Sequence, residues 1–106
     1  MKASKRANLE RSGWKLGSTQ EFLGLTDEEA AYIELKLALG AELQRARSER
    51  SCTQAELAEL MGSSQSRVAK MEAADPTVSV DLLVRALLAL GRSGREIGRV
   101  IARAGD

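Results

Sequence analysis

The sequence contains no histidine and a single cysteine, Cys52, and these absences exclude several kinds of site. A metal site built from histidine and cysteine ligands needs several such side chains, and a histidine-based catalytic triad needs an imidazole. No phosphate-binding glycine loop or nucleophile elbow is present either, and most acidic residues stand where helices are expected to begin. We therefore expect no metal, no cofactor and no catalytic residue, and we do not expect an enzyme. Cys52 cannot form a disulfide within the chain, and we expect a structural role for it.

Proline and aromatic residues are also scarce, and long apolar runs are missing. Pro76 is the only proline, aromatic residues make up 3% of the 106 residues, and hydrophobic residues make up 43%. No stretch approaches the roughly 18 apolar residues of a transmembrane helix, and no apolar segment follows the basic N-terminus as in a secretory signal. The composition therefore predicts one helical domain with an aliphatic core, in a cytoplasmic, nucleoid-associated protein.

The formal net charge is only +1, so the overall charge does not point to a nucleic-acid partner. The charge is unevenly distributed, because residues 1–26 carry five basic and two acidic groups, whereas residues 27–40 carry one and four. Residues 1–25 are predicted to form a basic arm and an apolar strap, Phe22–Leu25, that docks on the domain. The basic residues of the arm would either enter a minor groove or remain solvated.

Residues 26–106 are predicted to form a domain of five helices, each introduced by a capping residue. Three capping boxes, in which a hydroxyl residue precedes a glutamate by three positions, begin at Thr26, Thr53 and Ser93. The first helix is expected to run to about Arg50, with Gly40 permitting a kink or break. Gly62 is expected to end one later helix in the left-handed conformation, and Gly91 is expected to end another.

The segment from Thr53 to Glu72 carries the functional signal. Its apolar residues fit two short helices that pack against each other across a glycine-containing turn. The outward side chains of the second helix are Gln65, Ser66, Arg67 and Lys70, and none of them is acidic. Glutamine pairs with adenine, lysine and arginine pair with guanine, and serine pairs with either, so this edge suits the major groove of DNA. The alternative is an ordinary solvent-facing helix.

These residues resemble the helix-turn-helix of the XRE and Cro-repressor family. The run Thr-Gln-Ala-Glu-Leu-Ala from Thr53, the glycine of the turn and the run Ser-Gln-Ser-Arg-Val from Ser64 follow the family's pattern. The likeness covers roughly residues 39–91 and implies an all-α, five-helix, lambda-repressor-like DNA-binding domain, here with an N-terminal extension. Ala74 departs from the pattern where a glycine often ends the recognition helix, so that helix is expected to end differently.

The resemblance also implies roles for individual residues. Base contacts are expected from Gln65, Ser66 and Lys70. Phosphate contacts are expected from Gln54, Ser64, Arg67 and Thr53, helped by backbone N–H groups at the start of the first helix. Arg47 and Glu72 occupy positions that often form a salt bridge in this family, and we interpret them as a structural pair.

Proteins of this kind usually dimerise, because one headpiece reads too few base pairs. We expect a homodimer on a double-stranded DNA operator, with Ile97, Val100 and Ile101 of the last helix as the candidate interface. The N-terminal extension resembles that of HigA-like antitoxins, which repress their own operon and bind a small toxin. Two alternatives stay open: a phage-type or controller-type repressor without a toxin, and an interaction module that has lost DNA binding.

Overall fold

The computed structural model describes residue 21 and residues 23–104, and over this part of the chain all regular secondary structure is helical. The five helices are α3 (Asp27–Glu49), α4 (Gln54–Met61), α5 (Gln65–Glu72), α6 (Val80–Ala89) and α7 (Gly94–Ala104). The predicted all-α, five-helix fold is therefore confirmed. The predicted basic arm, residues 1–20, and Phe22 of the predicted strap lie outside the described residues. None of the described helices is long and apolar enough to cross a membrane.

Local sequence signals set the helix boundaries. At the start of α3, the Thr26 hydroxyl accepts from the Glu29 N–H at 3.1 Å, and the Glu29 carboxylate accepts from the Thr26 N–H at 2.9 Å. Equivalent reciprocal pairs begin α4 and α7, as the three capping boxes predict. Each box satisfies backbone N–H groups that have no partner inside the helix, which fixes where the helix begins.

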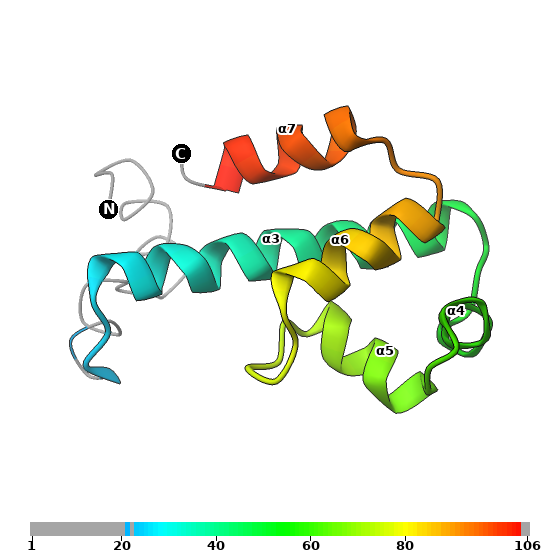
Figure 1. Cartoon of the computed structure of the whole chain (residues 1–106), viewed down its shortest axis with the longest axis horizontal. Helices are drawn as coiled ribbons and strands as arrows, with labels where there is room; N and C mark the ends of the chain where they lie inside the picture. Colours follow the sequence, from blue (N-terminus) through cyan, green and yellow to red (C-terminus); the bar gives the residue numbers. More distant parts are fainter. Residues whose placement is uncertain (1–20, 22, 105–106) are drawn as a thin grey trace.

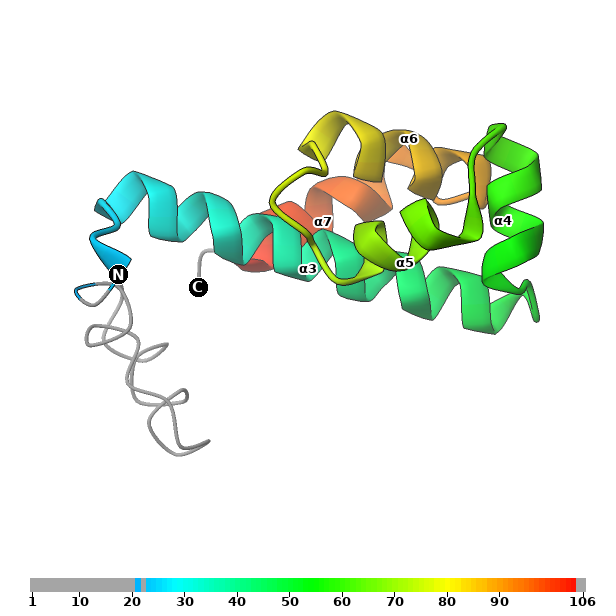
Figure 2. The same ribbon diagram turned by 90° about the horizontal axis from the view of Figure 1, so that it is seen from below.

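The long helix α3 is the axis of the molecule, and the shorter helices pack around it (Figure 1). α6 and α7 lie along α3, while α4 and α5 lie at one end of the bundle and cross each other steeply. The view from below shows that the first turns of α3 project beyond α4, α5 and α6 (Figure 2). The α4–α5 pair therefore lies at one end of the bundle, and the N-terminal part of the α3 helix projects from the other end.

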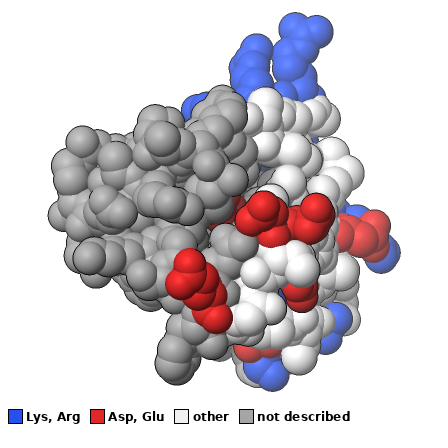
Figure 3. Space-filling view, turned by 90° about the vertical axis from the view of Figure 1, so that its left-hand side faces the viewer, with Lys and Arg blue, Asp and Glu red and all other residues white. Residues whose placement is uncertain are grey.

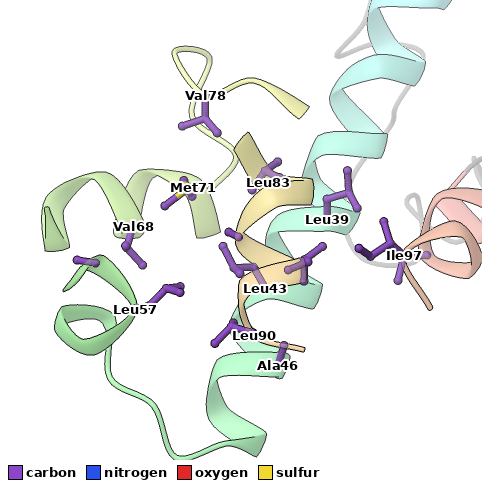
Figure 4. Close-up of a cluster of buried hydrophobic side chains, with 14 residues drawn as sticks. Leu39, Leu43, Ala46, Leu57, Val68, Met71, Val78, Leu83, Leu90 and Ile97 are labelled. Atoms are coloured by element: carbon purple, nitrogen blue, oxygen red, sulfur yellow. The ribbon is translucent and has the colours of Figure 1, made fainter. Parts of the chain in front are cut away.

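A single aliphatic core joins the helices, and side chains from all five of them contribute to it (Figure 4). Leu57 of α4, Val68 and Met71 of α5 and Leu83 of α6 are all fully buried. Burying each such side chain contributes roughly 1.5–3 kcal/mol, so the orientation of α4 and α5 is set by the same core that holds the domain together.

Gly40 does not kink or break α3, and this expectation was wrong. α3 is continuous, and Gly40 is buried where the end of α5 approaches it. A Cβ atom at this position would lie 2.8 Å from the Glu72 carbonyl oxygen and 3.0 Å from that of Met71. The absence of a side chain at Gly40 therefore allows the two helix backbones to meet.

The C-terminal end of α5 also differs from the expectation. Ala74 adopts φ of +54°, the left-handed conformation that glycine usually supplies at this place, so the helix ends in the ordinary way. The Asp75 N–H donates to the Lys70 carbonyl at 3.0 Å, and the Ala74 N–H donates to that of Met71 at 3.1 Å. Alanine thus holds a backbone conformation that costs roughly 1–2 kcal/mol for a residue with a Cβ atom.

The predicted docking of the strap Phe22–Leu25 fails at Leu23. The Leu23 side chain is 58% exposed, whereas Leu25 is half-buried. Gly24, with φ of +68°, donates its N–H to the Glu21 carbonyl at 3.1 Å, and the chain turns there before it enters α3. The turn leaves Leu23 pointing away from the core.

Candidate nucleic-acid interface

α4 and α5 are joined by a three-residue turn, Gly62–Ser64, that local chemistry stabilises. Gly62 ends α4 with φ of +64°, and the Ser63 N–H donates to the Ala58 carbonyl at 2.8 Å. The Ser64 hydroxyl then caps α5 by accepting from the Arg67 N–H at 3.2 Å. Because Ala58 is small and buried, α5 can pack closely on α4. The result is the helix-turn-helix geometry expected from the sequence.

One edge of α5 faces the core and the other faces solvent. Val68 and Met71 are fully buried. The outward edge, which we call the α5 edge, consists of Gln65, Ser66, Arg67 and Lys70, and all four are exposed. No hydrogen bond or ion pair to another described residue engages their side chains. The geometric condition for reading a groove is therefore met, because the donors and acceptors of this edge face outward.

Exposed capping hydroxyls stand at the starts of α4 and α5. Thr53 caps α4 by accepting from the Glu56 N–H at 3.0 Å, and Ser64 caps α5. A hydroxyl that accepts one hydrogen bond keeps its own proton to donate. Both exposed residues can therefore support their helix and donate to a phosphate oxygen at the same time.

Arg47 of α3 and Glu72 of α5 form the predicted structural salt bridge. Arg47 Nε lies 2.6 Å from Glu72 Oε2, and Nη2 donates to Oε1 at 3.2 Å. Their side chains are 16% and 7% exposed, and Arg47 Nη1 also donates to the Cys52 carbonyl at 2.9 Å. The hydrogen bond that Arg47 donates to Glu72 raises the pKa of Arg47 above its ordinary value, and burial opposes that effect. This bidentate contact fixes the end of α5 against α3.

Gln54 makes a contact that its predicted phosphate role did not include. Its amide Nε2 donates to Glu72 Oε1 at 3.1 Å, so the first residue of α4 is tied to the last residue of α5. Gln54 is half-buried, in keeping with this internal contact. Its amide has a second N–H, and the phosphate contact stays a prediction.

Two of the three residues predicted to form a dimer interface are unsuited to that role. Ile97 and Val100 are only 5% and 7% exposed, because the apolar side of α7 packs on α3 within the same chain. Their side chains belong to the protein's own core and leave little surface for a second copy. Only Ile101, which is 37% exposed, remains accessible.

Arg92, which precedes α7, forms ion pairs with two carboxylates of α3. Its Nε donates to Glu42 Oε2 and its Nη2 donates to Glu49 Oε1, both at 2.9 Å. The hydrogen bonds that Arg92 donates to Glu49, and then to Glu42, raise the pKa of Arg92 above the ordinary value. These pairs fasten the loop before α7 to α3, on one side of a charged cleft of about 390 Å³.

The fold and the α5 edge together define a helix-turn-helix DNA-binding domain. Residues 38–100, more than half of the chain, match the family described as helix-turn-helix domain, and the protein belongs to this family. The family's domains bind DNA in transcription regulation and are typically non-enzymatic. No curated protein and no solved structure matches the chain. Within the described residues, no cluster of carboxylates and thiols is arranged to hold a metal ion.

Proposed function

We propose that this protein is a sequence-specific transcriptional regulator that binds double-stranded DNA as a homodimer. Gln65, Ser66 and Lys70 read base edges in the major groove, while Arg67 and the two capping hydroxyls contact the DNA backbone. The observation that carries this proposal is the α5 edge: four exposed polar side chains with no acidic member, standing on a helix whose opposite side is fully buried.

The contacts that hold both ends of α5 favour sequence-specific recognition of DNA over non-specific electrostatic binding. The recognition helix is fixed at its start by the Ser64 cap and at its end by the Arg47–Glu72 pair. Base-edge contacts require side chains to be placed to within fractions of an ångström, which such fixed helix ends provide. Lys70 and Arg67 supply positive charge, but the chain's net charge of +1 makes strong non-specific binding unexpected.

The test begins by selecting bound sequences from a random pool of duplex DNA with the full chain, followed by affinity measurements over a range of salt. Gln65→Ala is expected to lose about 1–3 kcal/mol of discrimination at one base pair without changing the salt dependence. Arg67→Ala is expected to weaken binding to all sequences alike and to reduce the logarithmic salt slope by about 0.9. Arg99→Ala in α7, an exposed arginine on the far side of α3, is the matched control.

The selection also separates the proposal from its alternative, an interaction module that has lost DNA binding. If no sequence is enriched and no duplex binds even at low salt, the regulator proposal is wrong. If DNA binds but Gln65→Ala and Lys70→Ala bind as tightly as the wild type, only the residue assignment is wrong.

The more specific proposal is an autoregulating antitoxin, and the alternative is a repressor without a toxin partner. The antitoxin proposal is supported by the extension before the domain and by the acidic first turn of α3, formed by Asp27, Glu28 and Glu29. Co-expression with the product of the neighbouring gene is expected to give a stable complex and to rescue growth. If the neighbouring product is harmless and does not bind, the repressor without a toxin is favoured.

A further inference from the structure

The charged cleft beside Arg92 lies between α3 and α7, and we call it the α3–α7 cleft. α7 packs on the opposite side of α3 from α5, so the cleft is remote from the α5 edge (Figure 1). Its volume of about 390 Å³ falls within the roughly 300–1,000 Å³ of small-molecule sites. All of its lining residues are charged except Val100, which is buried. Such a lining suits a charged ligand and not an apolar one.

Helical spacing explains why these side chains share the cleft. Residues three or four positions apart lie on one face of a helix, and both helices present such a face. The lining residues are Glu42, Arg45 and Glu49 of α3, Glu96, Arg99, Val100 and Arg103 of α7, and Arg92 of the loop between α6 and α7. Because Val100 is buried within the core, this face of α7 is held towards α3.

The charge of Arg92 is balanced within the protein. Its Nε donates to Glu42 and its Nη2 donates to Glu49, both at 2.9 Å. Glu42 also accepts from Arg45 Nη1, and its side chain is only 9% exposed. Both oxygens of this carboxylate are therefore engaged by arginines of the cleft itself.

Arg99 and Arg103 are not balanced in this way. They lie four residues apart on α7, both are exposed, and no ion pair or hydrogen bond to another described residue engages their side chains. The one acidic lining residue of α7, Glu96, uses an oxygen to accept from the Ser93 N–H at 2.8 Å. Figure 3 views the end of the molecule where α3 begins, and basic side chains project at the top of that view, on the side where α7 lies. Four arginines and three glutamates line the cleft, so one positive charge is in excess.

We propose that the α3–α7 cleft binds a small anion with several charged oxygens, held by Arg45, Arg99 and Arg103. A guanidinium group donates through a planar fork that fits two oxygens of a phosphate or a carboxylate. Arg45 uses Nη1 for Glu42, and no other described residue engages its Nε or Nη2. The three forks come from two facing helices, so they can hold an anion from both sides of the cleft.

The position of the cleft favours a small ligand over the backbone of DNA. When the α5 edge faces a major groove, α7 lies behind α3 and faces away from the duplex (Figure 2). The cleft and the α5 edge share no residue, so anion binding in the cleft does not depend on the proposed function.

Isothermal titration calorimetry of the full chain tests the site with two probes, pyrophosphate and citrate, at a fixed ionic strength of about 0.15 M. Pyrophosphate offers phosphoryl oxygens and citrate offers carboxylate oxygens, so the two titrations distinguish the two sources of charge. Saturable binding of either probe, at one site per chain, is the expected result. If neither probe binds in a saturable way, the proposal is wrong.

Arginine substitutions locate the site. Arg99→Ala and Arg103→Ala are each expected to weaken the bound probe by about 10-fold or more, because each removes charge-assisted hydrogen bonds. Arg99→Lys keeps the charge without the fork and is expected to give an intermediate affinity. Arg95→Ala is the matched control, since Arg95 is exposed on the same helix but does not line the cleft. If Arg95→Ala weakens binding as much as the cleft variants, the attraction is general and the cleft is not a site.

Thermal unfolding gives an independent readout. A ligand that binds only the folded state raises the melting temperature, but phosphate-like and carboxylate-rich salts also stabilise proteins generally. The probe is therefore expected to raise the melting temperature of the wild type and of Arg95→Ala more than that of the double variant Arg99→Ala with Arg103→Ala. An equal rise in all three proteins contradicts binding in the cleft.

Binding to duplex DNA distinguishes this site from the proposed function. Arg99→Ala is expected to lose affinity for the probe and to keep its affinity for DNA, whereas Arg67→Ala is expected to do the reverse. A chain that binds the probe but no DNA removes the proposed function and leaves the anion site intact. If Arg99→Ala and Arg103→Ala weaken DNA binding and neither probe binds, these arginines hold the DNA backbone and the anion site is wrong.

Discussion

Replacing Gly40 with alanine tests how closely the recognition helix packs on α3. In the interior of an exposed helix, this substitution stabilises by about 1 kcal/mol. At Gly40 the new Cβ atom would lie 2.8 Å and 3.0 Å from two backbone carbonyl oxygens of α5, against roughly 3.5–4.0 Å for an ordinary contact. Since neither oxygen can rotate away, α5 must move from α3 and strain the Arg47–Glu72 pair.

The balance of these effects gives the expected magnitude. Inserting a methyl group into a tightly packed contact typically costs about 1–3 kcal/mol, which exceeds the gain in helix propensity. With the gain in helix propensity subtracted, we expect Gly40→Ala to destabilise the protein by up to about 2 kcal/mol, which lowers the melting temperature by up to about 15 °C for a domain of this size. Thermal unfolding followed by circular dichroism measures this change.

Gly98 in α7 provides a matched control. It is an exposed helix residue, and a Cβ atom built there meets nothing within 4 Å. Gly98→Ala is therefore expected to stabilise the protein by about 1 kcal/mol, so the two substitutions of the same kind have opposite signs. If Gly40→Ala raises the melting temperature as Gly98→Ala does, the reasoning about the α3–α5 contact is refuted.

Three further predictions concern stability. Glu72→Ala leaves the largely buried Arg47 without its carboxylate and is expected to destabilise the protein by about 3 kcal/mol in chemical denaturation. The double variant Arg47→Met with Glu72→Leu leaves no unpaired charge and is expected to cost less. A loss below about 1 kcal/mol for Glu72→Ala would show that the pair is dispensable for stability. Ala74→Gly relieves a left-handed alanine and is expected to stabilise by about 1 kcal/mol, while Ala73→Gly, at a right-handed position, gives no such gain. Finally, capping lowers the pKa of three glutamates below the ordinary value of 4.5, so their contribution to stability is present above that pH and is lost as the pH falls through the lowered values. These are Glu29, Glu56 and Glu96. When all three are replaced with alanine, the melting temperature is expected to fall less steeply as the pH is lowered. An equally steep fall in the triple variant and the wild type would contradict this prediction.

Features whose partners lie within a few residues could be predicted from the sequence. The capping boxes at Thr26, Thr53 and Ser93 and the left-handed end at Gly62 depend on hydrogen bonds between near neighbours. Helical periodicity likewise indicated which side of α5 is buried and left the α5 edge outward. The Arg47–Glu72 pair was found through the family resemblance, and no local pattern gave it.

Features that join distant segments were decided only by the tertiary structure. The sequence shows the helix propensity lost at Gly40, but not the α5 carbonyls that explain it. Gln54 and Glu72 are 18 residues apart, and Glu42 and Arg92 are 50 apart, so no helical spacing relates them. The apolar face of α7 suited either a core or an interface, and packing against α3 decided for the core. Local hydrogen bonding and periodicity therefore determine the helices and their faces, whereas the partner of each face depends on how the helices pack together.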